Sequence, residues 1–340
     1  MSERRAPHPD RLCKLVKEFS QRRVCVVGDA VADQFLYGEI SRVSREAPVL
    51  ILRHERTETL PGGAANCATN ARSLGATVKL VCTAGADEAG GAMLAKLRTA
   101  GVDCRGVIES PGVRTTTKMR ILAGQAHSLR QQVIRVDFGD EAAVQGALQE
   151  EIAGRLREAI EAADAVIISD YNYGAVNEDV ISILEEASIR RKLPVLVDSR
   201  FRLLQFPGFL SATPNEDEAE HVGGKRLADA HALEIYAEEL RARLNYESLL
   251  VTRGRRGMLL LEKNCAPLHI EAVGDREAID VTGAGDTVIA TYTLALASGA
   301  SFVEAAHLAN HAGGIVVMKR GTASASADEL IASVKSGAAN

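Results

Sequence analysis

The residues with the clearest chemical potential lie in the segment DVTGAGDT at positions 280–287. Gly283 and Gly285, separated by one small residue, let the backbone turn sharply so that successive N–H groups face one point. The apolar run 288–296 predicts a buried helix whose N-terminus adds to this anion site. Asp286 would be repelled by a resting phosphate there, but it could take a proton from a hydroxyl that attacks a phosphoryl group. Taken alone, the motif favours a simpler interpretation, a glycine-rich turn with Asp286 as helix N-cap.

Length and composition limit the class of protein. The 340 residues, 46% hydrophobic and 25% charged, are ordinary for a soluble globular protein. A net charge of −5 gives no electrostatic footprint for nucleic acid or an acidic membrane, so we expect neither as partner. The six cysteines include no CxxC pair, which favours reduced thiols over a metal site. No apolar run could span a membrane and the first residues lack a secretory signal, so we expect a cytoplasmic protein.

Alternating apolar strands and amphipathic helices predict a doubly wound α/β sheet. Strands at 24–27, 78–82, 165–169 and 195–197 are continuously apolar, as in a parallel sheet buried on both faces, and strands at 249–252 and 258–261 follow. Helices are predicted at 10–19, 89–99, 141–161, 178–190, 230–244, 288–296, 304–318 and 328–334. The turn after the first strand has one glycine rather than the three of a dinucleotide fingerprint, which argues against a dinucleotide site.

Two insertions interrupt this alternation, at about 34–60 and 112–138. The first contains short β-like pieces at 35–37 and 49–52, and the second reads as a hairpin of strands 114–122 and 132–138. We therefore expect a single domain over residues 1–340, with a small β lid built from both insertions.

Further polar groups stand where ligands bind in such folds. Asp33, Asp170 and Asp198 follow strands, and the carboxyl ends of parallel strands are the usual ligand edge. The segment PGGAAN at 61–66 opens a helix that runs to residue 74, where a turn and helix cap would also explain the glycines. The candidates for gripping a polyhydroxy acceptor are Asp33, Gly62, Gly63, Asn66, Asp170 and Asp198.

The nucleotide side has its own signals. No GxxxxGK[ST] motif is present, which argues against a Walker-type loop. Asn215 and Glu218 would lie on one face of the first turn of a helix, suited to binding Mg²⁺ through water. The turn RGRRG at 253–257 could lie over phosphates. Together with Asp286 these features predict phosphoryl transfer to a sugar hydroxyl.

The order and spacing of Gly28-Asp29, PGGAAN, TPNEDE and DVTGAGDT resemble the ribokinase-like (PfkB) carbohydrate kinases, from the first strand to the last helix. More closely, SRVSREAPV, TTKMR, QQVIRVDF and SDYNYGA resemble the D-glycero-β-D-manno-heptose-7-phosphate kinases. The resemblance implies a three-layer α/β/α fold and ATP-dependent phosphorylation of the anomeric hydroxyl, on the route to ADP-heptose and lipopolysaccharide. In many bacteria such kinases are fused to a nucleotidyltransferase domain. The given sequence stops after the kinase motifs, so we expect it to resemble the stand-alone form.

The resemblance also implies roles for single residues. Asp286 matches the catalytic base, with Gly283, Ala284 and Gly285 as its anion hole. Glu218 matches a residue that binds Mg²⁺ through water, and a monovalent cation such as K⁺ is left open. The positions that match ATP-binding residues are Asn215, Glu218, Thr252, Arg253, Gly254, Gly257 and Asn310. Two departures affect substrate contacts, since Tyr173 and Ser199-Arg200 stand where relatives have lysine and Pro-Lys.

The lid carries a cluster of cations. Lys118 and Arg120 alternate along one strand and therefore point to the same face, which suggests that they bind the phosphate of a sugar phosphate. Arg135 on the returning strand, or Arg42 on the other insertion, would assist, from the same chain or from a partner. Since isolated strand pairs with apolar residues need cover, we expect a homodimer through the lid. The alternatives are a kinase for another phosphosugar, such as a hexose phosphate, and a sensor without catalysis.

Overall fold

The computed structural model describes residues 7–125, 130–139, 144–224, 226–227, 229–274 and 278–337. In these residues the larger sheet has nine strands in the order β13-β12-β11-β10-β9-β8-β1-β4-β5. The strands from β5 to β11 are parallel, whereas β12 and β13 pair antiparallel at one edge. Their bounds are β1 (Arg23–Gly28), β4 (Thr77–Gly85), β5 (Asp103–Ser110), β8 (Ala165–Asp170), β9 (Val195–Ser199), β10 (Ser211–Ala212), β11 (Ser248–Thr252), β12 (Met258–Glu262) and β13 (Leu268–Ile270).

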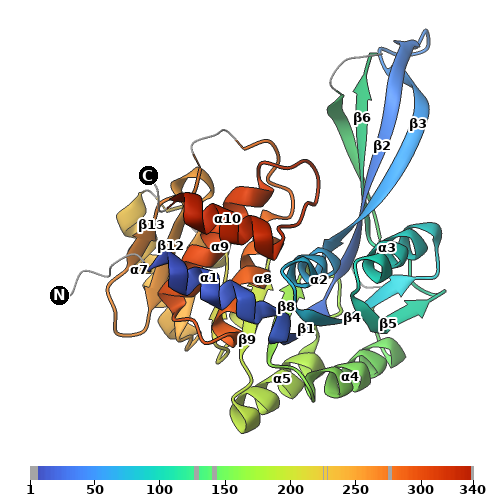
Figure 1. Ribbon diagram of the computed structural model, residues 1–340. Helices are drawn as coiled ribbons and strands as arrows, with labels where there is room; N and C mark the ends of the chain where they lie inside the picture. Colours follow the sequence, from blue (N-terminus) through green and yellow to red (C-terminus); the bar gives the residue numbers. More distant parts are fainter. Residues whose placement is uncertain are drawn as a thin grey trace.

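Helices cover both faces of this sheet, which confirms the three-layer α/β/α prediction (Figure 1). In β1, Val24 and Val26 point to one helical layer and Cys25 and Val27 to the other, as expected for a strand buried on both sides. The first layer contains α1 (Pro9–Glu18), α2 (Ala64–Ser73), α3 (Glu88–Thr99), α8 (Ala284–Ala297), α9 (Phe302–Val316) and α10 (Ala327–Gly337). The second contains α4 (Ala147–Ile160), α5 (Glu178–Arg191) and α7 (Ala230–Arg243), and the short α6 (Glu216–Gly223) follows β10.

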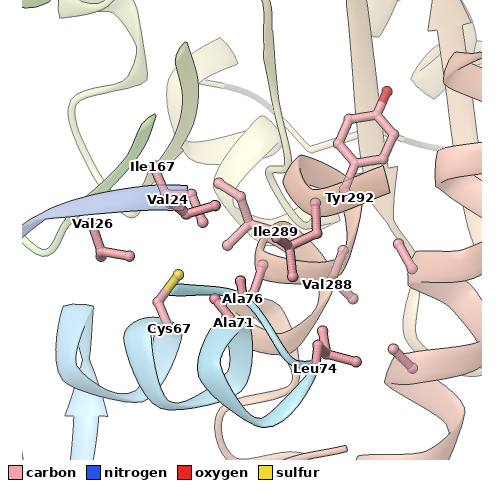
Figure 2. Packing of buried hydrophobic residues seen from close by; sticks show 14 of the residues in the cluster. Val24, Val26, Cys67, Ala71, Leu74, Ala76, Ile167, Val288, Ile289 and Tyr292 are labelled. Carbon is pink, nitrogen blue, oxygen red and sulfur yellow. The ribbon is translucent and has the colours of Figure 1, made fainter. Parts of the chain in front are cut away.

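Helix α8 is the buried helix that the run 288–296 predicts. Its residues from Asp286 to Ala295 are all buried. Figure 2 shows Val288 and Ile289 among side chains of α2 and of strands β1 and β8. Because both the sheet and α2 hold this helix, its first turn is fixed relative to the carboxyl ends of the central strands. Among the helices of the described ranges, none has the length and apolar character needed to cross a bilayer.

The two insertions form one sheet that projects from the larger layers (Figure 1). Its order is β3-β2-β6-β7, with β2 parallel to β6 and both outer pairs antiparallel. The bounds are β2 (Ala30–Val43), β3 (Leu50–Gly63), β6 (Thr117–Gly124) and β7 (Gln131–Phe138). The lid prediction is therefore confirmed in outline.

The sequence nevertheless underestimates the length of the first pair. Strands β2 and β3 each have 14 residues, where only the short pieces at 35–37 and 49–52 were expected. The PGG segment forms the end of β3 instead of a separate turn. The charged, exposed residues of β2 and β3 hide the strand pattern in the sequence. Bulges near Tyr37 and Ile40 also shift the alternation of side chains between the two faces of the sheet. Strands β5 and β13 were not predicted, and the helix expected at 141–161 begins at Ala147, while its predicted start, 141–143, lies outside the described residues.

Candidate active site

Asp286 lies in the first turn of α8, where it is only 3% exposed. The helix N-cap is Gly283, with a φ of 77°, so Asp286 is not the cap. Its carboxylate instead accepts two side-chain hydrogen bonds, from Asn66 Nδ2 to Oδ2 at 2.7 Å and from the Tyr171 hydroxyl to Oδ1 at 3.2 Å. A Cβ at position 283 would lie 2.5 Å from Asn66 Nδ2, so only glycine allows this approach. The Ala284 N–H donates a hydrogen bond to the carbonyl oxygen of Val281, with 3.2 Å between nitrogen and oxygen, and this bond closes the turn.

The surroundings of Asp286 suit a base that works near neutral pH. Burial raises the pKa of its carboxyl to about 7, against the opposing effect of the hydrogen bonds from Asn66 and Tyr171. The charge of Asp33 raises this pKa further, and that of Lys118 lowers it. A carboxylate with a pKa near 7 can accept a proton in the transition state and release it afterwards.

The loop after β8 is tied to the end of β1 by a buried carboxylate. Asp29 accepts backbone hydrogen bonds from Tyr171 at 2.8 Å, from Tyr173 at 3.0 Å and from Ala175 at 3.0 Å. This clamp fixes the backbone of the tyrosine that contacts Asp286. In the sequence Asp29 stands out only as part of a motif, because nothing in the pattern indicates that its hydrogen-bond partners lie so far along the chain.

A cavity of about 480 Å³ opens in front of Asp286 at the carboxyl ends of the parallel strands. A Cβ added at Gly285 would have Asp198 Oδ2, at 4.0 Å, as its nearest neighbour, so this part of the turn leaves open space for an anion. The candidates from the sequence that line the cavity are Asp170, Asp198, Asn215, Glu218, Thr252, Gly283, Gly285 and Asp286, and Arg200 lines it too.

Three carboxylates around this cavity repel one another. Burial raises the pKa of Asp198 well above its usual value, and the charges of Glu218 and Asp286 add to the effect. The pKa of Glu218 is also raised by burial. Arg200 opposes both shifts. Bringing these groups together costs free energy unless a cation is present, so Glu218 and Asp198 of this acidic set fit a divalent ion.

The local geometry favours binding of such an ion through water. Asn215 is the N-cap of α6 and forms a reciprocal capping box with Glu218, in which Glu218 Oε2 accepts the N–H of Asn215 at 2.9 Å. One carboxylate oxygen of Glu218 is thus occupied. Among the described residues, no group of three or more His, Cys, Asp or Glu side chains is arranged to hold a metal directly.

Asp170 is placed differently from the expectation that it grips a sugar. Its carboxylate accepts a hydrogen bond from the Ser199 hydroxyl at 2.6 Å and forms an ion pair with Arg202. Since Asp170 is 1% exposed, these contacts make it a support for the loop after β9. Ser199, one of the two departures from the relatives' pattern, therefore contributes to this support.

A second cavity, of about 830 Å³, lies on the other side of the glycine turn. Thr252, Gly254, Gly257 and Asn310 line it as expected, whereas Arg253 forms an ion pair with Glu216 at 2.9 Å and does not line it. Thr252, Val281 and Gly285 line both cavities, so the two adjoin at the turn. The apolar walls of this cavity were not predicted, because they come from separate parts of the chain. They are Met258, Val273, Ala278, Val288 and Val317.

The sugar-side candidates meet at the base of the lid. Asp33 is 5% exposed and pairs with Arg120, whose Nη1 lies 2.5 Å from Oδ1. Asp33 also approaches Gly62 so closely that a Cβ there would clash. Lys118 stands opposite Asp33 in the β2–β6 register, with Nζ 5.2 Å from the centre of the Tyr171 ring. Burial lowers the pKa of Lys118.

The two assisting arginines have different positions. Arg135 stands directly opposite Arg120 in the β6–β7 register, and it forms an ion pair with Asp137 at 2.9 Å. Arg42 is exposed at the far end of β2, opposite Ile51. At roughly 3.3 Å per residue it lies about 30 Å along the strand from Asp33. The expectation that Arg42 could assist from the same chain is therefore wrong.

Comparison with known proteins places this site in a family. A family model described as pfkB family carbohydrate kinase matches residues 21–329. The bifunctional protein HldE of Methylococcus capsulatus is 43% identical over 320 residues, which are 93% of this chain and 64% of that protein. HldE of Trichlorobacter lovleyi is 36% identical over 326 residues, which are 94% of this chain and 65% of that protein. The chain thus spans slightly less than two thirds of these relatives.

Solved structures agree on the fold. A structure of Arabidopsis thaliana ribokinase complexed with ribose and ATP has a TM-score of 0.73 at 20% identity, covering 92% of this chain and 99% of that one. Phosphofructokinase-2 from Escherichia coli has a TM-score of 0.75 at 18% identity, covering 93% of this chain and 99% of that one. The fold is therefore ribokinase-like, and with the family match over most of its length the chain belongs to the pfkB carbohydrate kinases.

Proposed function

We propose that this sugar kinase transfers the γ-phosphoryl group of ATP to the anomeric hydroxyl of D-glycero-β-D-manno-heptose 7-phosphate. The product, heptose 1,7-bisphosphate, would serve ADP-heptose and lipopolysaccharide core synthesis in the cytoplasm. The observation that carries the proposal is the placement of Asp286, buried at the N-terminus of α8 and held by Asn66 and Tyr171 where the two cavities adjoin. The heptose assignment rests on the motifs of the sequence and on the basic lid face.

In this proposal the acceptor hydroxyl lies against Asp286. The carboxylate takes the hydroxyl proton as the oxygen attacks the γ-phosphorus, and the bond from phosphorus to the bridging oxygen of ADP breaks. The turn stabilises the negative charge that develops on the phosphoryl oxygens at Gly283 and Gly285, and not through the expected Ala284 N–H, which is bonded to the Val281 carbonyl. Mg²⁺, held through water by Glu218 with Asp198 nearby, would offset the charge of the phosphates.

The nucleotide occupies the 830 Å³ cavity in this arrangement. The apolar residues Val273 and Val317 would cover the base, and Gly254 lines the same cavity. Thr252 lies where the two cavities adjoin. The phosphate chain would then run past Gly285 toward Asp286. The sugar lies between Asp286 and the lid, with Asp33 on its hydroxyls and Lys118 and Arg120 on its terminal phosphate.

We also propose that the lid forms a homodimer. Among the described residues, five exposed large apolar side chains lie on the lid or at its strand ends: Val43, Val49, Leu50, Val133 and Ile134. Strands β3 and β7 are the edges of the four-stranded lid sheet, and an apolar sheet edge in water favours pairing with another chain. A second copy that offers the same edge would cover these residues.

An assay of ADP release across heptose, hexose and pentose phosphates, each with and without Mg²⁺, tests the function. Heptose 7-phosphate should give the highest kcat/KM, and unphosphorylated heptose should be a poor substrate. If a hexose phosphate is preferred, the catalytic site stands but the substrate is wrong. If no sugar stimulates ADP release above the rate without sugar, the chain is a sensor and not a kinase of this substrate class.

A further inference from the structure

The phenol of Tyr171 touches the catalytic base directly, although the proton transfer described above needs only Asp286. Its hydroxyl donates to Asp286 Oδ1 at 3.2 Å, while the other carboxylate oxygen is held by Asn66. The backbone of Tyr171 is fixed by Asp29. A Cβ at Gly63 would lie 3.3 Å from Cε2 of Tyr171, so the end of β3 also borders the ring closely.

We propose that Tyr171 is a positioning residue for the base: its hydroxyl keeps Asp286 ionised and fixed in the orientation from which it takes the proton of the sugar hydroxyl. This inference rests on the proposed function. With Asn66 on one oxygen and Tyr171 on the other, the carboxylate cannot turn about its Cβ–Cγ bond without breaking a hydrogen bond.

The charges around Asp286 make this donor necessary. Asp33 on β2, Asp198 at the end of β9 and Glu218 on α6 surround this site with negative charge, and Lys118 on β6 is the cation that lowers the pKa of Asp286. Cys67 on α2 stays a neutral thiol, because burial raises its pKa well above the usual value. A hydrogen bond to the ionised form offsets part of the repulsion.

Tyr171 itself remains a donor over the working pH range. Burial and the charges of Asp286 and Asp198 raise the pKa of its hydroxyl well above the usual value. It therefore donates a proton to the hydrogen bond and does not compete with Asp286 as a base. The ring also faces Lys118 Nζ, so one side chain contacts both the base and a cation expected to bind the sugar phosphate.

The test is the pH dependence of kcat/KM in Tyr171→Phe. In the parent, kcat/KM should fall below about pH 7, following the pKa of Asp286. Because the variant loses a hydrogen bond to the ionised carboxylate, this fall of kcat/KM on the acid side, the acid limb, should move up by about one pH unit. The loss relative to the parent should be roughly fivefold at pH 7 and about tenfold well below pH 7. KM for ATP should stay within about twofold of the parent. An unmoved acid limb would overturn the proposal.

Tyr246→Phe is the matched control. It removes another buried tyrosine hydroxyl, which donates to the Phe206 carbonyl at 2.6 Å within the apolar cluster on the other side of the sheet. This variant should lose stability without a shift of the acid limb. If both variants shift the limb equally, a general loss of packing explains the effect and the proposal fails.

Thermal unfolding tests the same idea without any sugar. A higher pKa of Asp286 in the folded variant extends the pH range over which ionisation destabilises the fold. The loss of melting temperature in Tyr171→Phe should therefore be larger at pH 9 than at pH 6, and this pH dependence should vanish in an Asp286→Asn background. An equal loss at both pH values overturns the inference. If the parent turns over no sugar phosphate while this pattern holds, the proposed function fails and the Tyr171–Asp286 coupling stands.

Discussion

Arg120 Nη1 lies 2.5 Å from Oδ1 of Asp33, so the arginine expected to bind the sugar phosphate is paired with the aspartate expected to bind sugar hydroxyls. Both side chains are largely buried, 14% and 7% exposed. A buried ion pair is costly to break from one side, because the remaining charge has no partner. The two groups proposed to recognise the sugar are therefore coupled, and in the proposed function a substrate phosphate would share Arg120 with Asp33.

The variant Arg120→Ala should raise KM for the sugar phosphate by about 10- to 100-fold, since a hydrogen bond to a charged group is worth about 1.5–3 kcal/mol. KM for ATP should stay nearly unchanged, and unphosphorylated heptose should lose less than the sugar phosphate, because only the unpairing of Asp33 affects it. Steady-state kinetics with both sugars measures this. Arg53→Ala, which removes an exposed lid arginine paired with Glu39, is the control and should behave like the parent. Equal discrimination between the two sugars by parent and variant would show that Arg120 does not recognise the phosphate.

The variant Asp286→Asn should lose about 10²- to 10⁴-fold in kcat, the usual contribution of a general base. The amide keeps the shape of the side chain but cannot take the hydroxyl proton. ATP affinity, measured by calorimetry, should change little, because Asp286 acts on the acceptor. A rate within a few-fold of the parent would mean that Asp286 is a structural residue of the α8 turn.

The buried carboxylates also predict how stability depends on pH. The pKa values of Asp198, Glu218 and Asp286 are raised in the folded state, so between about pH 4 and 7 the folded protein binds more protons than the unfolded chain. Stability from these groups is therefore greatest at low pH and falls as pH rises through that window. Mg²⁺ competes with the protons, so its stabilising effect should be larger at pH 8 than at pH 5.

Melting temperatures with MgCl₂, against NaCl of equal ionic strength, measure this effect. Asp198→Asn should reduce the Mg²⁺ shift at pH 8, because the variant has less repulsion to relieve. Glu186→Gln, an exposed carboxylate of α5 paired with Arg190, should leave the shift unchanged. A Mg²⁺ shift that is independent of pH would contradict binding at the acidic set.

The sequence predicts the parts of the site that depend on local pattern. The glycine turn, the buried helix after it and the Asn215–Glu218 spacing all appear near the predicted positions, because short-range sterics and hydrophobic periodicity determine them. Even so, the Asn215–Glu218 pair proves to be a capping box, a detail that spacing alone did not give.

Long-range pairing is what the sequence could not supply. Asn66 and Tyr171 donate hydrogen bonds to Asp286 from distant positions in the chain. Asp170 accepts a hydrogen bond from Ser199 and forms an ion pair with Arg202. Arg42 was a candidate because it is a cation on the same insertion as Asp33, but the two residues lie near opposite ends of the long strand β2. Such outcomes depend on how strands pair and how far they extend, and the charged residues of the lid gave no clear alternation from which to predict either.

The two edge strands of the lid, β3 and β7, expose apolar residues. If the exposed apolar residues of β3 and β7 are covered by a second copy, the parent should sediment as a dimer at micromolar concentration, and Ile134→Asp should dissociate it. Ile134 is 53% exposed on β7, and a charge buried in an apolar interface without a partner is costly. Ile189→Asp, at an 80% exposed position on α5, is the matched control and should remain dimeric. A parent that is monomeric at this concentration, or a control that dissociates equally, would rule out the lid as the interface, because only a charge on the interface itself should separate the copies.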